Sequence, residues 1–245
     1  MSSASPSPSG VPVVAQRLPV GTVGILGGLG PLAGAHFYRR LIEHTPVVGD
    51  SQHLPVVLVS DPTIPSRLDH LLDSGPSPVL ALAHLAQFLE SAGAQLIVIP
   101  SSTAHAYYQP IQDSVGVPVI NLLAVVANAI AAEGYRRPAL LATTATAVLD
   151  LYGPYLAPLA SPVYPDAASQ ADIQELVVTL KGGGDPGPLS DRLRELASRP
   201  WAQGADSIVL GCTELCLFDL PDFKLPVLSS TDELADAVLG LVAGR

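Results

Sequence analysis

Cysteine is scarce in this chain of 245 residues, which contains only Cys212 and Cys216. Two cysteines four positions apart are unsuited to a framework of structural disulfides, so we expect a protein of the reducing cytoplasm. Histidine is absent from the second half of the chain, and the six histidines of the first half show no pair at the spacing of metal ligands. We therefore expect neither a metal site nor a disulfide scaffold.

Charged side chains are few, at 14% of the residues, and 12 basic against 22 acidic residues give a net charge of −10. A negative surface repels phosphate backbones and anionic lipid, so neither nucleic acid nor a membrane is expected as a partner. The most apolar stretch, residues 115–132, is interrupted by Pro118, Asn121 and Asn128, which indicates a buried strand and helix rather than a membrane span. Residues 1–19 lack a basic start and an apolar core, so their Ser/Pro-rich composition predicts a disordered tail, neither a secretory signal nor an anchor.

Apolar residues are abundant, at 48% of the chain, and they form strand-like runs that alternate with helix-like runs. This order predicts an α/β fold. The pattern restarts near residues 118–135, so we predict two pseudo-symmetric lobes, each a mainly parallel sheet flanked by helices, with the active site in the cleft between them. We assign residues 20–120, completed by 229–245, to the first lobe and residues 121–228 to the second. Strands are predicted at 22–26, 55–60, 96–99, 118–120, 138–142, near 163, 207–210 and 226–228, and helices at 31–44, 78–91, 121–133, 145–156, 171–181, 188–197 and 232–242.

Two segments, residues 93–103 and 204–214, repeat one pattern of a Gly-Ala turn, a short run of branched apolar residues and a small polar residue. The run is typical of a buried parallel strand, and Ser101 in one copy corresponds to Cys212 in the other. Ligands of open α/β sheets bind at the carboxyl ends of strands. The repeat therefore predicts two half-sites that face each other, one with a hydroxyl and one with a thiol.

Cys212 is the stronger candidate for chemistry, because helix amides at a strand-to-helix junction lower the pKa of a thiol and make a thiolate base or nucleophile available. The alternative is an inert buried cysteine, which is the interpretation we give to Cys216. Ser101 has His105 one helical turn away, which leaves a serine-hydrolase pair open, although no acidic residue identifies itself as the partner of that histidine.

A glycine cluster at residues 24–30 lies between a predicted strand and a helix that begins with Pro31. The free amides of such a helix start can bind a carboxylate. The segment 28–33 also matches a dinucleotide fingerprint with alanine last, but no acidic residue ends a second strand at the expected distance, and a tight turn alone is the remaining alternative. A proline-rich loop, residues 60–66, leads to Arg67, which is either a carboxylate clamp or a solvated surface arginine.

Several segments together resemble the cofactor-independent aspartate/glutamate racemase superfamily, most closely its aspartate racemase branch. The similarity runs from about Val23 to Val238. It is carried by Gly27-Gly-Leu-Gly-Pro-Leu-Ala33, Ile64-Pro-Ser-Arg67, Pro100-Ser-Ser-Thr-Ala-His105, Leu141-Ala-Thr-Thr144 and Gly211-Cys-Thr-Glu-Leu215.

The resemblance implies an isomerase without metal, pyridoxal phosphate or nucleotide, in which two cysteines on opposite faces of the substrate α-carbon exchange its proton. It implies that Cys212 and Ser101 occupy the two catalytic positions and that a small-molecule carboxylate is the substrate. It also implies a homodimer, as the family often forms. The substrate-binding residues that it implies are Gly28, Leu29, Arg67, Ser102, Thr103, Thr144, Lys181, Thr213 and Glu214, with Arg67 and Lys181 on carboxylates, which favours a substrate with two of them.

The chain departs from the family pattern where the chemistry is done. Ser101 stands where the family has its first catalytic cysteine, Ser66 where it has an aspartate, and the segment 229–234 lacks the carboxylate and imidazole expected there. A serine hydroxyl does not titrate near neutral pH, so a symmetric two-base reaction lacks one base. Three hypotheses remain: an atypical amino-acid racemase or epimerase, a single-cysteine decarboxylase or isomerase (arylmalonate decarboxylase-like or recruited to specialised metabolism), and a non-catalytic dicarboxylate-binding protein.

Overall fold

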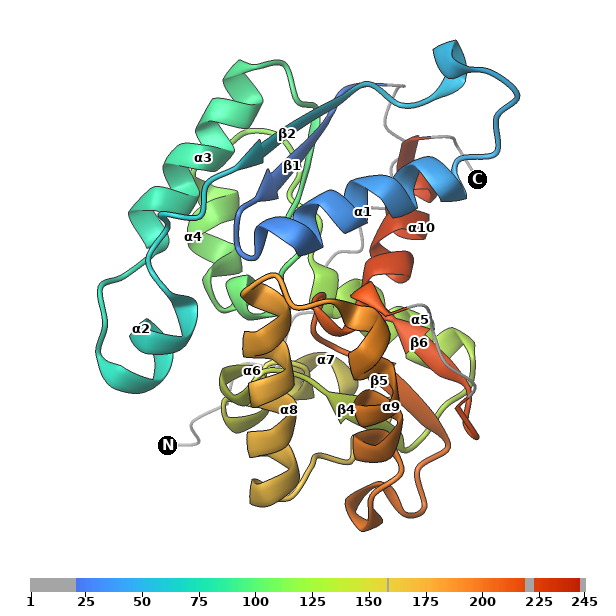
Figure 1. Ribbon diagram of the computed structural model, residues 1–245. Coiled ribbons are helices and arrows are strands. Elements are labelled where there is room, and N and C mark those ends of the chain that lie inside the picture. The colour runs from blue at the N-terminus through green and yellow to red at the C-terminus, as the bar shows by residue number, and fades with distance from the viewer. Residues whose placement is uncertain (1–20, 158, 219–222, 243–245) are drawn as a thin grey trace, which may run out of the picture.

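The computed structural model describes residues 21–157, 159–218 and 223–242 (Figure 1). The tail predicted at residues 1–19 lies outside the described residues, as do the last three positions of the segment 229–245. In the described part of the chain, none of the helices combines the length and apolar character that crossing a bilayer requires.

The first sheet has three parallel strands, with β1 (Val23–Gly27) between β2 (Val56–Ser60) and β3 (Leu96–Val98). Alternate residues of a strand point to opposite faces. Accordingly, Ile25 packs with Phe37 of α1 (Pro31–His44), and Leu26 packs with Leu82 of α3 (Val79–Ser91) on the other face. Both faces are therefore covered by helices, as the apolar strands predict.

The second sheet is also parallel, with β5 (Ser207–Leu210) between β4 (Pro138–Leu141) and β6 (Val227–Ser229). The helices α8 (Ala167–Lys181) and α9 (Pro186–Ala197) cover one of its faces, where Leu210 packs with Leu180 and Leu193.

The two sheets correspond strand by strand once two isolated bridges are included. Val119 bridges β3, and Val163 bridges β4, both in the parallel sense. The order β2, β1, β3, Val119 then matches Val163, β4, β5, β6. The α/β fold with two pseudo-symmetric lobes is confirmed, and the repeated segments become the equivalent strands β3 and β5. Their initial glycines, Gly93 (φ 94°) and Gly204 (φ 77°), share the left-handed conformation that glycine favours.

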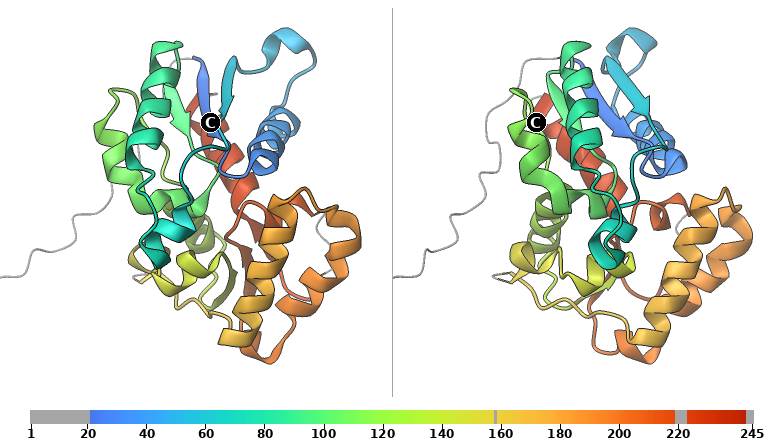
Figure 2. Two further views of the ribbon diagram at one scale, coloured as in Figure 1. Left: turned by 60° about the vertical axis from the view of Figure 1, so that its left-hand side comes forward. Right: turned by 90° about the vertical axis from the view of Figure 1, so that its left-hand side faces the viewer.

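The helix that follows the last strand position of each sheet packs against a helix that belongs to the other sheet. The helix α5 (Leu122–Ala132) follows Val119 and packs against α7 (Gly153–Leu156), whereas α10 (Ser230–Val242) follows β6 and packs against α1. The helices α5 and α10 also contact each other, and Figure 2 shows α10 among the helices of the first lobe. One hydrophobic core therefore contains Ile25 and Phe37 together with Leu140 and Val209.

Some short elements differ from the prediction. The predicted helix 145–156 is broken into α6 (Thr144–Val148) and α7, because Asp150 adopts a left-handed conformation (φ 47°) between them. The loop before Arg67 leads into a helix that was not predicted, α2 (Arg67–Asp73), capped by the Ser66 hydroxyl, which accepts from the Asp69 amide. The other elements are α4 (Tyr108–Asp113) and the 3₁₀ helices Asp50–Gln52, Ser102–Tyr107, Pro200–Ala202 and Leu215–Leu217.

Candidate active site

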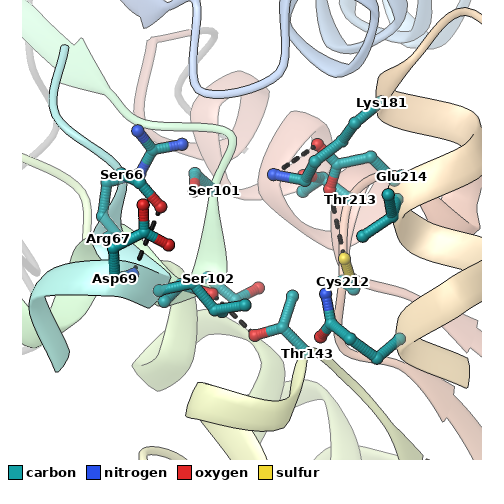
Figure 3. Close-up of a pocket in the computed structure, with 14 residues that line it drawn as sticks. Ser66, Arg67, Asp69, Ser101, Ser102, Thr143, Lys181, Cys212, Thr213 and Glu214 are labelled. Atoms are coloured by element: carbon teal, nitrogen blue, oxygen red, sulfur yellow. Dashed lines mark hydrogen bonds and ion pairs between the residues drawn. The ribbon is translucent and has the colours of Figure 1, made fainter. Parts of the chain in front are cut away.

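A cavity of about 240 Å³ lies where the carboxyl ends of β3 and β5 meet, as the repeat predicted. Its walls come from both lobes, with α2 of the first lobe facing α8 of the second (Figure 3). The lining residues are Ser66, Arg67, Leu68, Asp69, Ser101, Ser102, Thr103, Thr143, Gln174, Val178, Lys181, Cys212, Thr213 and Glu214.

Most of the predicted site residues line this cavity, and three do not. Thr144 does not line the cavity, whereas its neighbour Thr143 does. The backbone amide of Thr144 donates to Gln174 Oε1 of α8. Gly28 packs against the backbone of Asp61, and Leu29 is buried, with only its carbonyl oxygen directed to Arg67 and Lys181. Leu29 therefore contacts the site through its backbone oxygen alone.

Cys212, Glu214 and Lys181 form a connected set on the second-lobe side. The Cys212 thiol donates to Glu214 Oε2 at 3.1 Å, and Lys181 Nζ lies 3.2 Å from Glu214 Oε1 (Figure 3). Cys212 and Glu214 are almost fully buried, whereas a third of the Lys181 side chain is exposed. The thiol proton therefore points at a buried carboxylate that an ammonium group neutralises.

The expected thiolate at a helix start is a wrong prediction. The chain after Cys212 forms only one 3₁₀ turn, Leu215–Leu217, so no helix of useful length directs its amides at the sulfur. Burial and the Glu214 carboxylate raise the pKa of the Cys212 thiol well above its ordinary value, and Lys181 opposes this only in part. Cys212 consequently keeps its proton at neutral pH.

The other cysteine has a structural place. Cys216 is buried in the core of the second lobe, and its thiol lies 3.5 Å from the Leu210 carbonyl and 3.5 Å from Ser230 Oγ. It does not line the cavity. This agrees with the interpretation of Cys216 as a core residue.

His105 is not available as a base for Ser101. Its Nε2 accepts from the Leu122 amide at 3.0 Å, so the proton of the neutral ring is on Nδ1, which donates to the Ser101 carbonyl at 2.9 Å. Complete burial lowers the pKa of His105, which keeps the ring neutral. Because the ring faces the backbone of Ser101 rather than its hydroxyl, the geometry excludes the serine-hydrolase pair.

Threonine hydroxyls join the two lobes at the floor of the cavity. Thr103 Oγ1 lies 2.9 Å from Thr143 Oγ1 and 3.1 Å from Thr146 Oγ1, and the last two are 2.9 Å apart. Nearby, Thr213 donates to the Pro100 carbonyl at 3.0 Å. Since these hydroxyls contact each other or the backbone, their first role is to hold the half-sites in register.

Tyr152 also links the two lobes, through its hydroxyl group. Its fully buried hydroxyl shares its proton between Ser102 Oγ at 3.2 Å and the Gly211 carbonyl at 3.3 Å, so it links the residues that follow β3 and β5. Burial raises the pKa of Tyr152, which keeps this donor protonated.

Arg67 and Lys181 converge on one oxygen atom. Arg67 Nη2 donates to the Leu29 carbonyl at 2.6 Å, and Lys181 Nζ donates to the same oxygen at 3.0 Å. Arg67 is therefore not a solvated surface residue. Two cations that share one carbonyl lie close enough to share a carboxylate.

The start of α1, where the sequence predicted an anion, faces the carboxylate of Glu214. A Cβ atom at Gly30 would collide with Glu214 Oε1, so only glycine permits this approach. The same carboxylate leaves no room at Gly30 for the pyrophosphate that the dinucleotide interpretation requires.

Six lining residues were not predicted, namely Ser66, Leu68, Asp69, Thr143, Gln174 and Val178. Gln174 and Val178 precede Lys181 at helical spacing, so the choice of Lys181 together with helix periodicity would have found them. Ser66 and Asp69 have the spacing of a capping residue and an acidic residue in the first helical turn. This signal was overlooked because the prolines before Ser66 indicate a loop.

Within the ranges that the structure describes, no three His, Cys, Asp or Glu side chains come close enough to hold a metal ion.

Comparisons with known proteins give a consistent result. The family model for Asp/Glu/hydantoin racemases matches residues 26–238. The broad specificity amino-acid racemase RacX of Bacillus subtilis (strain 168) is 25% identical over 224 residues, which cover 89% of this chain and 96% of that protein.

Solved structures show the same fold. Picrophilus torridus aspartate racemase superimposes with a TM-score of 0.78 at 28% identity, covering 89% of this chain and 93% of that one. Glutamate racemase from Francisella tularensis subsp. tularensis SCHU S4, in complex with D-glutamate, superimposes with a TM-score of 0.63 at 16% identity, over 91% and 81% of the two chains. At this identity the second likeness concerns the fold alone.

Proposed function

The chain belongs to the Asp/Glu/hydantoin racemase family and is a racemase-type isomerase, and from this premise we propose that Cys212 moves the proton at the α-carbon of an amino-acid substrate. The observation that carries the proposal is the hydrogen bond from the Cys212 thiol to the buried Glu214 carboxylate.

Glu214 gives the thiol proton a destination. When the proton moves to Glu214, Cys212 becomes a thiolate, which then takes the α-proton and returns to a thiol. The electron pair of the broken C–H bond moves into the substrate carboxylate as an enediolate. Arg67 and Lys181, which converge on the Leu29 carbonyl oxygen, stabilise this developing charge.

The opposite face lacks a comparable group. Ser101 follows the equivalent strand β3, and its hydroxyl is too weak an acid and base to exchange protons quickly at neutral pH. A water molecule, hydrogen-bonded to the Ser101 hydroxyl, delivers the proton on this face, and the proton held by Glu214 then neutralises the hydroxide. While the enediolate lasts, the proton that Cys212 has taken exchanges with solvent through Glu214, and Cys212 then returns a solvent proton to its own face. Because this return is faster than delivery by water on the face of Ser101, exchange with retention outpaces inversion.

The test is α-proton exchange in deuterated water, followed by proton NMR on a panel of L- and D-amino acids. Wild-type protein is expected to replace the α-proton by deuterium. Cys212→Ser is expected to lose this activity, whereas Cys216→Ser, which alters a buried thiol outside the cavity, keeps it. Exchange that survives in Cys212→Ser contradicts the proposal, and binding without exchange by the wild type favours a binding protein.

A second candidate function rests on the protonated state of Cys212. A thiol that keeps its proton, opposite a face with hydroxyls and no base, is suited to protonating the carbanion formed when carbon dioxide leaves a malonate. Carbon dioxide release from substituted malonates, lost in Cys212→Ser, is the result that favours this reaction over α-proton exchange.

A further inference from the structure

Asp69 is a carboxylate of the cavity wall for which the racemase reaction has no evident use. It lies on α2, opposite the wall that carries Lys181 and Cys212 (Figure 3). Asp69 is exposed, and among the residues that the structure describes its carboxylate forms no hydrogen bond and no ion pair, although its backbone amide donates to the Ser66 hydroxyl that caps α2. We propose that Asp69 selects amino acids whose side chain ends in a cation. This inference rests on the proposed function of the same site.

The cations of the site provide for one carboxylate rather than two. Arg67 and Lys181 donate to the same Leu29 oxygen. The α-carboxylate of a substrate can therefore accept hydrogen bonds from both cations in place of that oxygen. Neither cation is left to hold a second carboxylate at a distance. The sequence-based expectation of a substrate with two carboxylates therefore finds no matching pair of sites.

The balance of charge in the cavity points the same way. Arg67 and Lys181 are offset by Asp69 and Glu214, so the charges of the side chains that line the cavity nearly cancel. A dicarboxylate would bring two negative charges, one of them towards Asp69. A basic amino acid carries one carboxylate for the Arg67 and Lys181 pair, and its distal cation compensates Asp69.

Two apolar side chains of the cavity suit an aliphatic chain. Leu68 lines the cavity from α2, and Val178, an exposed residue, lines it from the facing helix α8. Methylene groups can pack on such apolar side chains while their charged end stays near water. The cavity volume of about 240 Å³ is below the roughly 300–1000 Å³ of sites for drug-sized ligands, which fits a molecule the size of one amino acid.

The experiment compares lysine with norleucine, which has the same carbon chain without the terminal ammonium group. In deuterated water, the ratio of α-proton exchange rate to KM is expected to be about tenfold higher for lysine, and higher again relative to glutamate. Asp69→Asn is expected to bring the lysine and norleucine values within about twofold of each other. The matched control is Asp73→Asn, on the same helix but outside the cavity lining, and it retains the preference for lysine.

Equal exchange of lysine and norleucine by the wild type contradicts the inference and leaves the proposed function intact. A preference that persists in Asp69→Asn contradicts it too. Calorimetric titration of lysine and norleucine into Cys212→Ser separates the two claims: selective lysine binding without exchange by the wild type supports the inference alone, and failure to bind lysine contradicts it.

Discussion

Single residues set the chemistry of the site, and Glu214 has the most influence among them. Its carboxylate accepts a hydrogen bond from the Cys212 thiol at 3.1 Å and, after burial, is the main cause of the raised pKa of that thiol. The acid strength of the Cys212 thiol in the proposed reaction therefore depends on Glu214 as well as on the cysteine itself.

Glu214→Gln removes the charge and is expected to lower the pKa of Cys212, because a neutral amide no longer opposes the thiolate. Thiolate absorbance in the ultraviolet, followed during a pH titration in a Cys216→Ser background, measures the shift. The absorbance should rise at lower pH in the variant than in the parent. Coincident titration curves would show that Glu214 does not control the thiol.

The raised thiol pKa also links stability to pH. The unfolded thiol ionises near its ordinary pKa of about 8.5, while the folded thiol stays protonated. This contribution to the free energy of unfolding is complete below that value and is lost as pH rises towards the folded pKa. When the pH is raised from about 8 to about 10, the free energy of unfolding measured by chemical denaturation should fall less for Cys212→Ala than for the wild type. Parallel losses would contradict this assignment.

Gly28 holds the loop that positions the Leu29 carbonyl. Its φ of 91° is in the left-handed region, and a Cβ there would collide with the Asp61 backbone. Gly28→Ala is expected to lower the free energy of unfolding by about 2 kcal/mol or more. The control is Gly49→Ala, where a Cβ meets no atom within 4 Å. Urea denaturation that gives equal values for both variants contradicts the account.

At the scale of elements, long and strongly patterned segments were predictable and short ones were not. The strands β3 and β5 follow from runs of branched apolar residues that a buried parallel strand requires, and α1 and α3 were found within a residue or two. The helix α2 was missed because the prolines before it read as loop, and the break at Asp150 depends on a backbone angle that sequence does not reveal.

The same distinction applies to the site. Ser101 and Cys212 could be placed because strand ends are local features of the sequence. The contacts of Lys181 with Glu214 and of Thr103 with Thr143 join distant segments, so only the folded structure reveals them.

The helix α10 carries a carboxylate whose ionisation opposes folding. Burial, followed by the charges of Asp236, Asp232 and Glu133, raises the pKa of Glu233 to about 7, and His44 opposes this. The neutral form therefore stabilises the fold most below the unfolded pKa of about 4.3, and this contribution is lost as pH rises through 7. Glu233→Gln should be more stable than the wild type at about pH 8, on the order of 1 kcal/mol, with little difference at about pH 5. If the free energy of unfolding changes with pH to the same extent in Glu233→Gln and in the wild type, this assignment is contradicted.

At the scale of the whole molecule, the exchanged helices α5 and α10 tie the lobes into one core. The helix α10 packs against α1, while the boundaries proposed for the lobes, residues 20–120 with 229–245 and residues 121–228, stay a prediction. Dimerisation, which the family resemblance implied, stays a prediction.

A shared core predicts that the lobes unfold together. Trp201 is the single tryptophan of the chain and packs, partly buried, against the core of the second lobe, so its fluorescence reports on that lobe. Far-ultraviolet circular dichroism reports on both lobes. The two urea transitions should coincide, and an earlier fluorescence transition would indicate that the second lobe unfolds independently.

The central claim is that Cys212 serves one face of the substrate and that the face of Ser101 has no base. The most direct test is the ratio of α-proton exchange to inversion of configuration, measured on one enantiomer in deuterated water by NMR and chiral chromatography. The account predicts that the wild type incorporates deuterium mainly with retention and that Ser101→Cys raises inversion towards the rate of exchange. A wild type that inverts the substrate as fast as it exchanges the proton would contradict it.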